Sequence, residues 1–578
     1  MPSFTLRCPA PRRRRAPARV VASLAVPLIG LLAGCGALRS PAASDPPGSA
    51  EAARCAARGP DIACTEHGAV RGVMEGTLLS FKGIPYAQPP VGRLRWQPPQ
   101  PPHPWSGVRD ATRFGAICPQ LVNGQVAGEE DCLTLNVWTA PRLAGGDTAP
   151  GPRAVMVFFP GGGNHGFSGQ GAPVFGGVAY SGGALVPQDV VLVTFNWRLG
   201  ALGYLAHPAL DAERRERVSG NWGLLDQVAA LRWVRRNIAA FGGDPKRVFA
   251  FGTSAGGGNL CTLLATPAAH GLLTGVALQA SVPTGCELPT LAQAQAATGQ
   301  RVAQALGCAS GVSGTSDTAG SAGTSSSAAD VAACLRARPM SEVVRAVPGT
   351  FGLLPRLYGP VVDGVVVPQQ PIAAIHAGRH TAVHALVGNS THETMQFVDS
   401  VGPVADEAAY ATAVARVFGA QDAPRIVAAY PAASFASPRE ALVRLTTDAY
   451  FTCSSRRVAR ALARNQAQPV FRFLFDHALE NDPAQRALGA VHTLEHFFLF
   501  PFSGRYVPTE AERGLQRLMA GHWTLAARTG RPGSTWPATV PGDAVLRIGP
   551  GASAEVVRPD AAAQCDFWDT VRLPHPHL

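Results

Sequence analysis

The chain has 578 residues, of which 46% are hydrophobic and 15% charged, with a mean hydropathy of +0.08. This composition can bury a large core and excludes a globally disordered chain. The net charge of +11 does not indicate a nucleic-acid partner, because six arginines before Cys35 carry six of these charges. The other basic residues are dispersed, without the Lys/Arg clusters that track phosphates.

The N-terminal segment resembles an export signal. A basic stretch, 12–19, precedes an apolar run, 20–33, that is too short to span a bilayer as a mature helix. The run ends in Leu32-Ala-Gly-Cys35, which resembles a bacterial lipobox. We expect a lipoprotein-type signal peptide at 1–34, a lipidated Cys35 and a tether over 35–50.

The expected location follows from this segment. Gly36 is not the Asp associated with inner-membrane retention, so we expect an outer-membrane lipoprotein facing the periplasm or the exterior. A periplasmic or secreted protein without lipid is the alternative. No other segment has the pattern of a transmembrane helix, so the membrane should be met only through the lipid anchor.

The run 155–159 has the pattern of a buried strand, and Pro160-Gly-Gly-Gly-Asn164 follows it at once. Glycines at this point leave backbone N–H groups open, as an oxyanion hole requires. Gly161-x-Gly163-x-x-Gly166 also fits a dinucleotide-binding fingerprint. No clear helix opens at Gly166, however, and no acidic residue follows about twenty positions later to bind a ribose. The oxyanion-hole interpretation is therefore favoured.

The most informative motif is Gly252-x-Ser254-x-Gly256. The hydrophobic run 247–251 precedes it, and the apolar run 260–265 follows it. Strand, sharp turn and helix in this order are what a nucleophile elbow needs. We predict that Ser254 is a nucleophile and that the Ala255 amide, at the start of the helix, faces a developing oxyanion.

An acid and a base should follow the serine along the chain. The apolar segment starting at Leu386 ends in a polar turn that carries Glu393. His492 lies on a short predicted loop before the apolar run 497–500. His392 is the rival base, but adjacent side chains rarely orient each other. The sequence therefore favours Glu393 as the acid and His492 as the base.

The stretch from His492 to His496 also matches the H-x-x-E-H motif of inverted zinc proteases. That site needs a helix carrying both histidines and a third ligand downstream. The run 497–501 is poorly suited to extend such a helix. We predict neither a metal ion nor a cofactor.

Together these segments resemble a type-B carboxylesterase, of the cholinesterase/carboxylesterase branch of the α/β-hydrolases. The resemblance runs from about residue 65 to 570. It implies one domain over 51–578, with a mostly parallel, twisted central sheet, flanking helices and large insertions. It implies a triad of Ser254, Glu393 and His492. The implied oxyanion hole consists of the amides of Gly162, Gly163 and Ala255. Further matching segments are Phe81–Ala87, Glu130–Val137, Asn196–Gly200, Gly220–Asp226, Phe241–Pro245 and Cys565–Trp568.

Several positions depart from the family pattern. Thr253 replaces the usual Glu before the nucleophile, which predicts the loss of a buried negative charge beside the serine. Asn164 replaces a frequent aromatic residue, which predicts a polar group near the acyl or leaving-group side. Gln279-Ala280-Ser281 replaces Gln-Ser-Gly, so either Ser281 supports the triad or that contact is missing. The loop between Cys118 and Cys132 holds no Trp, which argues against a choline-binding wall.

Twelve cysteines fit an oxidising compartment. The resemblance implies the disulfides Cys118–Cys132, Cys308–Cys334 and Cys453–Cys565. Cys55–Cys64 and Cys261–Cys286 then remain by elimination, with a free buried thiol at Cys261 as the alternative. The loop 309–330, rich in Ser, Gly, Thr and Ala, should be a flexible surface segment.

The predicted function is hydrolysis of small carboxylic esters through an acyl-enzyme. Two alternatives stay open. One is an amidase, carbamate hydrolase or thioesterase with the same triad, and the other is a catalytically inactive adhesion or scaffold protein on this fold. Low aromatic content, 7%, argues weakly against a deep aromatic gorge. The sequence leaves the natural substrate and the oligomeric state open.

Overall fold

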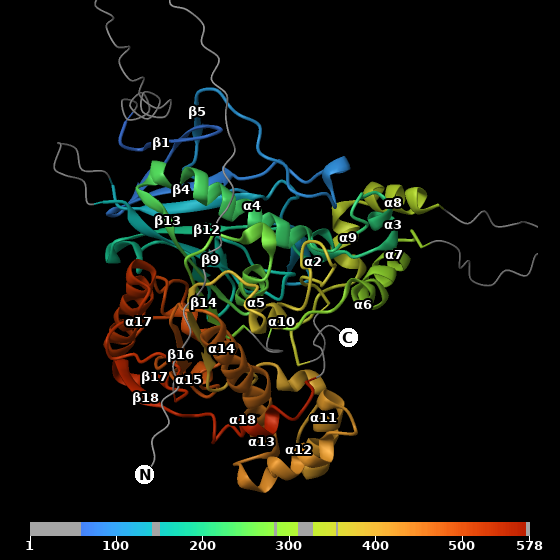
Figure 1. Cartoon of the computed structure of the whole chain (residues 1–578), viewed down its shortest axis with the longest axis vertical. Coiled ribbons are helices and arrows are strands. Elements are labelled where there is room, and N and C mark those ends of the chain that lie inside the picture. Colours follow the sequence, from blue (N-terminus) through green and yellow to red (C-terminus); the bar gives the residue numbers. More distant parts are fainter. Residues whose placement is uncertain are drawn as a thin grey trace, which may run out of the picture. The chain divides into compact units, whose positions relative to one another are not determined.

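A mixed sheet of eleven strands organises the chain (Figure 1). The neighbouring strands from β12 through β9, β13, β14, β15 and β16 to β17 pair in parallel. Antiparallel pairing is confined to the two sides, at β8, β4 and β3 and at β18. This is the α/β-hydrolase type of sheet that the sequence predicted. In spatial order the strands are β18 (Ser553–Val557), β17 (Val545–Gly549), β16 (Val470–Phe475), β15 (His384–Ser390), β14 (Gly275–Gln279), β13 (Gly243–Thr253), β9 (Arg153–Phe159), β12 (Val190–Phe195), β8 (Thr134–Thr139), β4 (Leu78–Pro85) and β3 (Val73–Glu75).

This computed structural model describes residues 59–141, 151–281, 286–309, 327–353, 357–540 and 542–573. The predicted signal peptide, tether and Cys35 lie outside these ranges. Within the ranges, no helix is both long and apolar enough to cross a bilayer.

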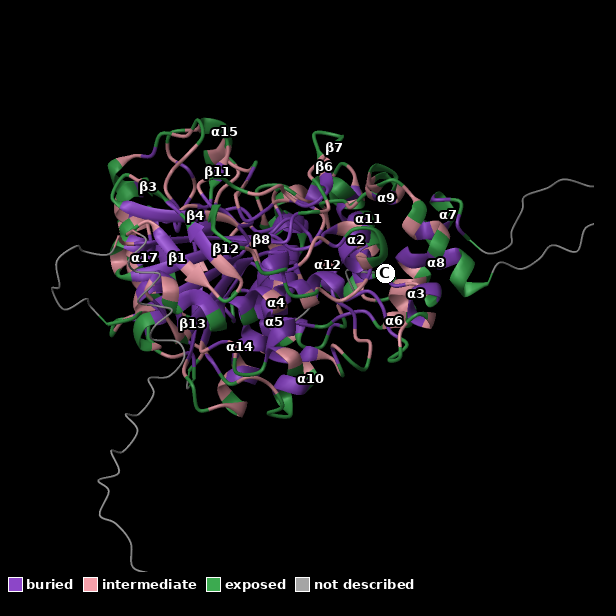
Figure 2. Cartoon of the chain, turned by 90° about the horizontal axis from the view of Figure 1, so that it is seen from above, coloured by how far each residue is buried: buried purple, intermediate pink, exposed green. Residues whose placement is uncertain are grey.

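The central strands are apolar on both faces because helices cover both sides of the sheet. Along β9, Val155 and Val157 face one core, whereas Met156 and Phe158 face the other, as the two-residue period of a strand requires. Helices α4 (Trp222–Asn237), α5 (Ala255–Leu264) and α14 (Cys453–Asn465) contribute to the first core. Helix α17 (Glu510–Thr529) contributes to the second. Figure 2 shows the strands buried and the exposed residues on the outer helices and loops.

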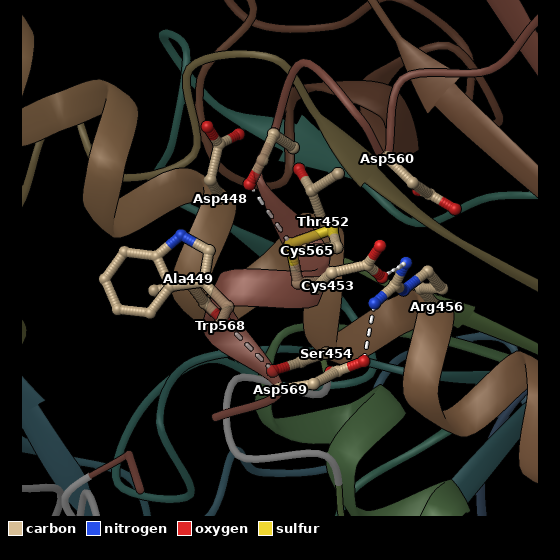
Figure 3. The surroundings of a disulfide bond; sticks show 12 residues. Asp448, Ala449, Thr452, Cys453, Ser454, Arg456, Asp560, Cys565, Trp568 and Asp569 are labelled. Carbon is tan, nitrogen blue, oxygen red and sulfur yellow. Dashed lines mark hydrogen bonds and ion pairs between the residues drawn. A yellow bond between two sulfur atoms is a disulfide. The ribbon is translucent and has the colours of Figure 1, made fainter. Parts of the chain in front are cut away.

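A third core lies among helices inserted between β15 and β16 and a helix that follows β18. It joins α11 (Glu407–Phe418), α12 (Ala423–Ala429), α13 (Pro438–Thr447), the π-helix η8 (Asp448–Thr452) and α18 (Cys565–Trp568). These α-helices lie together in Figure 1, at the opposite end of the picture from β1 and β5. The Cys453–Cys565 disulfide fastens α18 to the first residue of α14, directly after η8 (Figure 3).

Smaller elements complete the described chain. Strands outside the large sheet are β1 (Ile62–Thr65), β2 (Gly68–Arg71), β5 (Val108–Asp110), β6 (Gln120–Val122), β7 (Gln125–Ala127), β10 (Gly171–Ala172) and β11 (Val178–Ala179). Short helices are α2 (Gly200–Tyr204), α3 (Pro208–Ala212), α6 (Leu291–Ala294), α7 (Gln300–Ala305), α8 (Ala328–Ala337), α9 (Met340–Ala346), α10 (Pro371–His376), α15 (Pro483–Arg486) and α16 (Leu494–Phe497).

All three disulfides implied by the resemblance are present, namely Cys118–Cys132, Cys308–Cys334 and Cys453–Cys565. The open alternative at Cys261 is resolved as a disulfide with Cys286. Cys64 is also disulfide-bonded, while Cys55, its predicted partner, lies outside the described residues.

The predicted flexible loop, 309–330, extends too far at its end. Ser327 caps α8 by accepting a hydrogen bond from the Asp330 amide, and Asp330 accepts one in return from the Ser327 amide. This capping box starts a helix inside the predicted loop. Residues 310–326 lie outside the described ranges.

Candidate active site

Ser254 lies on the sharp turn between β13 and α5. Its backbone adopts φ 53° and ψ −126°, a strained conformation for a residue with a side chain. The Ser254 amide donates to Gln279 O at 3.0 Å, and Ser254 O accepts from the Gly258 amide at 3.0 Å. The turn is therefore held between the end of β14 and the first turn of α5, and it projects the serine hydroxyl.

The glycines of this motif are required by close backbone contacts. A Cβ at Gly256 would overlap the carbonyl oxygens of Phe159, the last residue of β9, and of Pro160, which follows it. A Cβ at Gly257 would overlap Ser281. The spacing of the motif thus reflects the close approach of α5 to two neighbouring strand ends.

The glycine loop after β9 lies beside the serine. Gly162 and Gly163 both have positive φ, 95° and 62°. Gly162 O accepts from the amides of His165 and Gly166 at 3.0 and 2.9 Å. Among the described residues, no acceptor receives the amides of Gly162 and Gly163. Two successive open N–H groups next to a serine form a concavity suited to an anion.

Glu393 and His492 meet although 99 positions separate them. His492 Nδ1 lies 2.5 Å from Glu393 Oε2, and Glu393 Oε1 accepts from the Ser390 amide at 2.6 Å. Glu393 is fully buried, and this burial raises the pKa of its carboxyl group. Such a contact fixes the orientation of the imidazole and stabilises its positive charge when it gains a proton.

Two phenylalanine rings pack edge-on against the imidazole. Phe397 lies 5.1 Å and Phe451 5.5 Å from His492, between ring centroids. Neither ring was predicted from the sequence, because each comes from an insertion whose position depends on the third core. The two rings restrict the imidazole on the sides that Glu393 does not contact.

Ser254 and His492 line one cavity of about 280 Å³, which we call the Ser254 cavity. Gly162 and Gly163 also line it. Among its described lining residues, none is Asp, Glu, Lys or Arg. Five are aromatic, a local concentration that the average composition hides. These five are Phe167, Phe351, Phe397, Tyr450 and Phe451.

Thr253 contacts a buried carboxyl group that the sequence did not predict. Because the pKa of this group is raised, it does not restore the negative charge that Thr253 was predicted to remove. Glu495 places a fully buried carboxyl group at the same point. It accepts hydrogen bonds from Thr253 Oγ1 at 3.1 Å and from Ser390 Oγ at 3.4 Å. Burial and the nearby Glu393 raise the pKa of Glu495. The sequence offered only its position three residues after His492 as a signal.

The prediction that Asn164 places a polar group near the acyl or leaving-group side was wrong. The side chain is buried and exchanges hydrogen bonds with Asn259, at 2.8 Å from Asn259 Nδ2 to Asn164 Oδ1. Tyr204 Oη also donates to Asn164 Oδ1 at 3.1 Å. Asn164 therefore ties the glycine loop to α5 and α2 and does not line the Ser254 cavity.

Ser281 forms no hydrogen bond with Glu393. Its hydroxyl is buried without a hydrogen-bond partner among the described residues. The neighbouring Ala280 has a positive φ of 48°. Glu393 instead receives its second hydrogen bond from the Ser390 amide.

The other sequence-derived candidates lie elsewhere. His392 lines a different cavity. His496 is buried against Tyr180, with Nε2 3.4 Å from the Tyr180 hydroxyl, and burial lowers its pKa to about 3. His492 and His496 thus have different partners, and α16, which carries His496 and not His492, has only four residues. Glu130, in one of the segments that match the family, pairs with Arg95, with Nε to Oε2 at 2.8 Å.

The chain is similar to proteins of known activity. The sequence model of the carboxylesterase family matches residues 60–568. The chain is 37% identical over 417 residues to a fumonisin B1 esterase from Sphingopyxis macrogoltabida, covering 71% of this chain and 70% of that protein. It is 33% identical over 494 residues to a para-nitrobenzyl esterase from Bacillus subtilis (strain 168), covering 82% of this chain and 92% of that protein.

Solved structures agree with this relationship. A PNB esterase superposes with a TM-score of 0.72 at 28% identity, covering 88% of this chain and 100% of that one. A thermophilic PNB esterase gives a TM-score of 0.72 at 27% identity with the same coverage. The chain therefore belongs to the carboxylesterase family, has the α/β-hydrolase fold and is a carboxylic ester hydrolase.

Proposed function

We propose that the protein cleaves esters in two acyl-transfer steps with Ser254, His492 and Glu393. His492 removes the proton of the Ser254 hydroxyl as its oxygen attacks the ester carbonyl. The same proton passes to the leaving alcohol, and the acyl group remains on Ser254. Water, activated by His492, then releases the carboxylic acid and restores the serine.

Glu393 holds the imidazole with Nδ1–H toward its own carboxylate and stabilises the imidazolium. The amides of Gly162, Gly163 and Ala255 donate to the tetrahedral oxyanion. Loss of one such donor typically costs about 10²- to 10³-fold in rate. The 2.5 Å contact between Glu393 and His492, with Ser254 on the same cavity, is the observation that carries this proposal.

The lining of the Ser254 cavity favours uncharged esters with an apolar or aromatic group. Its described residues offer five aromatic rings and no fixed charge. A carboxylate or ammonium buried there would lose its hydration without a partner. The para-nitrobenzyl ester named for one relative fits this description, so p-nitrobenzyl and p-nitrophenyl esters are the first substrates to test.

The test is hydrolysis of p-nitrophenyl butyrate by wild type, Ser254→Ala and Ser281→Ala. We expect Ser254→Ala to reduce kcat by about 10⁴- to 10⁶-fold. Ser281→Ala, a matched buried serine without a partner, should stay within about threefold of wild type. Turnover that survives in Ser254→Ala would show that another residue is the nucleophile. A matched amide that is cleaved faster than the ester would identify an amidase.

We also propose that the protein is exported and lipidated at Cys35. The basic segment, the apolar run and the lipobox-like Leu32-Ala-Gly-Cys35 support this. Radiolabelled fatty acid should enter the wild type and not Cys35→Ala. Equal labelling of both would exclude this lipidation site.

A further inference from the structure

A second cavity, of about 430 Å³, lies beside the turn that carries Glu393. We call it the His392 cavity, after the histidine that lines it. Its lining combines charged side chains with an apolar surface formed by Phe435, Val443 and Leu474. No residue of this lining takes part in the proposed ester hydrolysis.

Two charged residues of this lining, Asp476 and Arg547, already form hydrogen bonds within the protein. Asp476 accepts from Thr391 Oγ1 at 2.8 Å through one oxygen and from Arg547 Nε at 2.8 Å through the other. Arg547 Nη1 donates to Glu555 at 3.1 Å. These groups are satisfied within the protein and form a fixed side of the cavity.

Two lining residues of opposite charge, Arg444 and Glu440, have polar groups without a partner among the described residues. Arg444 donates from Nε to Asp448 at 2.7 Å, which fixes the plane of its guanidinium group. Among the described residues, its Nη1 and Nη2 have no acceptor. Glu440, one helical turn earlier on α13, has no partner for its carboxylate there, and the two side chains form no ion pair with each other. A guanidinium fork and a carboxylate are therefore both available to a ligand.

His392 adds an acceptor. The Thr391 hydroxyl has one proton and donates it to Asp476, so the 3.0 Å contact between Thr391 Oγ1 and His392 Nδ1 requires an Nδ1–H donor. Nε2 of the neutral ring is then unprotonated, and it has no partner among the described residues. Burial lowers the pKa of His392, which keeps the ring in this neutral form.

We propose that the His392 cavity is an effector site for a small zwitterion with an apolar body, an amino acid with an aromatic or branched side chain. The ligand carboxylate binds the free edge of Arg444. The ligand ammonium donates to Glu440 and to His392 Nε2. The apolar side chain packs on Phe435, Val443 and Leu474.

Two segments connect this cavity to the Ser254 cavity. Thr391 and His392 line the His392 cavity, while Thr394, in the same turn, lines the Ser254 cavity. In the second segment, Val443 and Arg444 line the His392 cavity, while Tyr450 and Phe451 line the Ser254 cavity.

The segments also contact each other, since Thr394 Oγ1 donates to Val443 O at 3.0 Å. The His392 amide donates to Ala490 O at 2.9 Å, two residues before His492. A ligand that contacts both segments therefore biases the positions of Glu393, of His492 and of the rings of Tyr450 and Phe451. The binding stands without the proposed catalytic roles, whereas the change in turnover rests on them.

The test uses the full chain and three probes of one shape: L-phenylalanine, hydrocinnamate and phenethylamine. Calorimetry should give the tightest binding for L-phenylalanine, which alone carries both charges. Glu440→Gln should raise its Kd by about fivefold. Glu407→Gln, an exposed glutamate in the first turn of α11, is the matched control and should leave the Kd unchanged. Arg444 is not substituted, because Asp448 would then be left buried without its cation.

The kinetic arm follows p-nitrophenyl butyrate hydrolysis with and without L-phenylalanine. A change in KM or kcat that weakens in Glu440→Gln and persists in Glu407→Gln supports the effector site. Absent binding, equal binding of the three probes, or an unchanged Kd in Glu440→Gln would overturn the site. Binding without any change in KM or kcat would overturn its effector role.

Discussion

The two sides of the Ser254 cavity are built by different means. On one side, Gly162, Ser254 and Glu393 each follow the carboxyl end of a parallel strand, β9, β13 or β15. Backbone pairing between adjacent strands fixes these ends, as in other open α/β sheets. The sheet thus positions Gly162, Ser254 and Glu393.

On the other side, the five aromatic rings that line the cavity form what we call the aromatic wall. The π-helix η8 contributes Tyr450 and Phe451 to it. Side chains hold this π-helix, and they come both from neighbouring helices and from strands β15 and β16. Asp448, its first residue, accepts from Arg444 at 2.7 Å and from the Tyr430 hydroxyl at 3.1 Å. Thr452, its last residue, accepts from Arg472 through its carbonyl at 3.3 Å.

The chain end completes this attachment. Figure 3 shows Cys565 bonded to Cys453 directly after η8, with Trp568 and Asp569 beside them. Arg456 is buried and pairs with Asp569 at 2.5 Å. The difference teaches that the positions of Ser254 and Glu393 depend on the sheet, while the position of Tyr450 and Phe451 depends on a cross-linked insertion. Perturbing one side should leave the other largely intact.

Among changes that leave Ser254, Glu393 and His492 in place, the largest expected effect is on the strand side, at Gly256→Ala. The added Cβ overlaps the carbonyl oxygens of Phe159 and Pro160, so the start of the glycine loop must move away from Ser254. We expect kcat to fall by at least about 10²-fold, as for loss of an oxyanion donor. Gly521→Ala, in open space on α17, is the control and should retain full activity. Unchanged kcat in Gly256→Ala would contradict the crowding argument.

Removing the cross-link should mainly affect the wall. Cys453→Ser with Cys565→Ser should lower the free energy of unfolding by about 2–5 kcal/mol. KM for p-nitrobenzyl esters should rise several-fold, while kcat for a p-nitrophenyl acetate stays near wild type. The double variant at Cys308 and Cys334 should lose stability without the rise in KM. Similar KM values in the two double variants would remove the link between this disulfide and the wall.

A single wall residue should give a smaller change. Phe451→Ala removes one ring from the cavity and one edge contact with His492. We expect KM for aromatic esters to rise by about 3- to 10-fold, the range of one aromatic contact. Phe114→Ala, a partly exposed ring outside the cavity, serves as the comparison. An equal rise in KM for both variants would point to a general loss of structure.

The smallest expected effect is on the pH dependence of stability, and it concerns the buried carboxyl group of Glu495. Because burial raises the pKa of Glu495, the folded protein holds a proton that the unfolded chain releases above its ordinary pKa of 4.5. Stability should therefore fall as the pH rises from 5 to 8. Glu495→Gln, which cannot ionise, should lose less stability across this window in denaturant titrations, whereas exposed Glu510→Gln should follow wild type. Identical slopes for wild type and Glu495→Gln would show that the folded and unfolded pKa values do not differ.

The strand side could be read from the sequence. Buried parallel strands give continuous apolar runs, and the turn around Ser254 needs small residues at fixed spacing. The predicted strands at 155–159 and 247–251 are confirmed as parts of β9 and β13, and the predicted helix at 260–265 overlaps the second half of α5. These features depend on near neighbours in the chain, so a local pattern is enough to predict them.

Tertiary structure alone decided the rest of the site. Glu495 reaches Thr253 across 242 positions, Asn164 turns toward Asn259, and Cys261 is cross-linked to Cys286. The aromatic wall was hidden because composition averages over the whole chain, whereas folding gathers five rings around one cavity. The sequence by itself predicted the fold and the turn that carries Ser254, since these follow from local backbone requirements. The direction of each buried side chain followed only from long-range packing, where each polar group must find its partner.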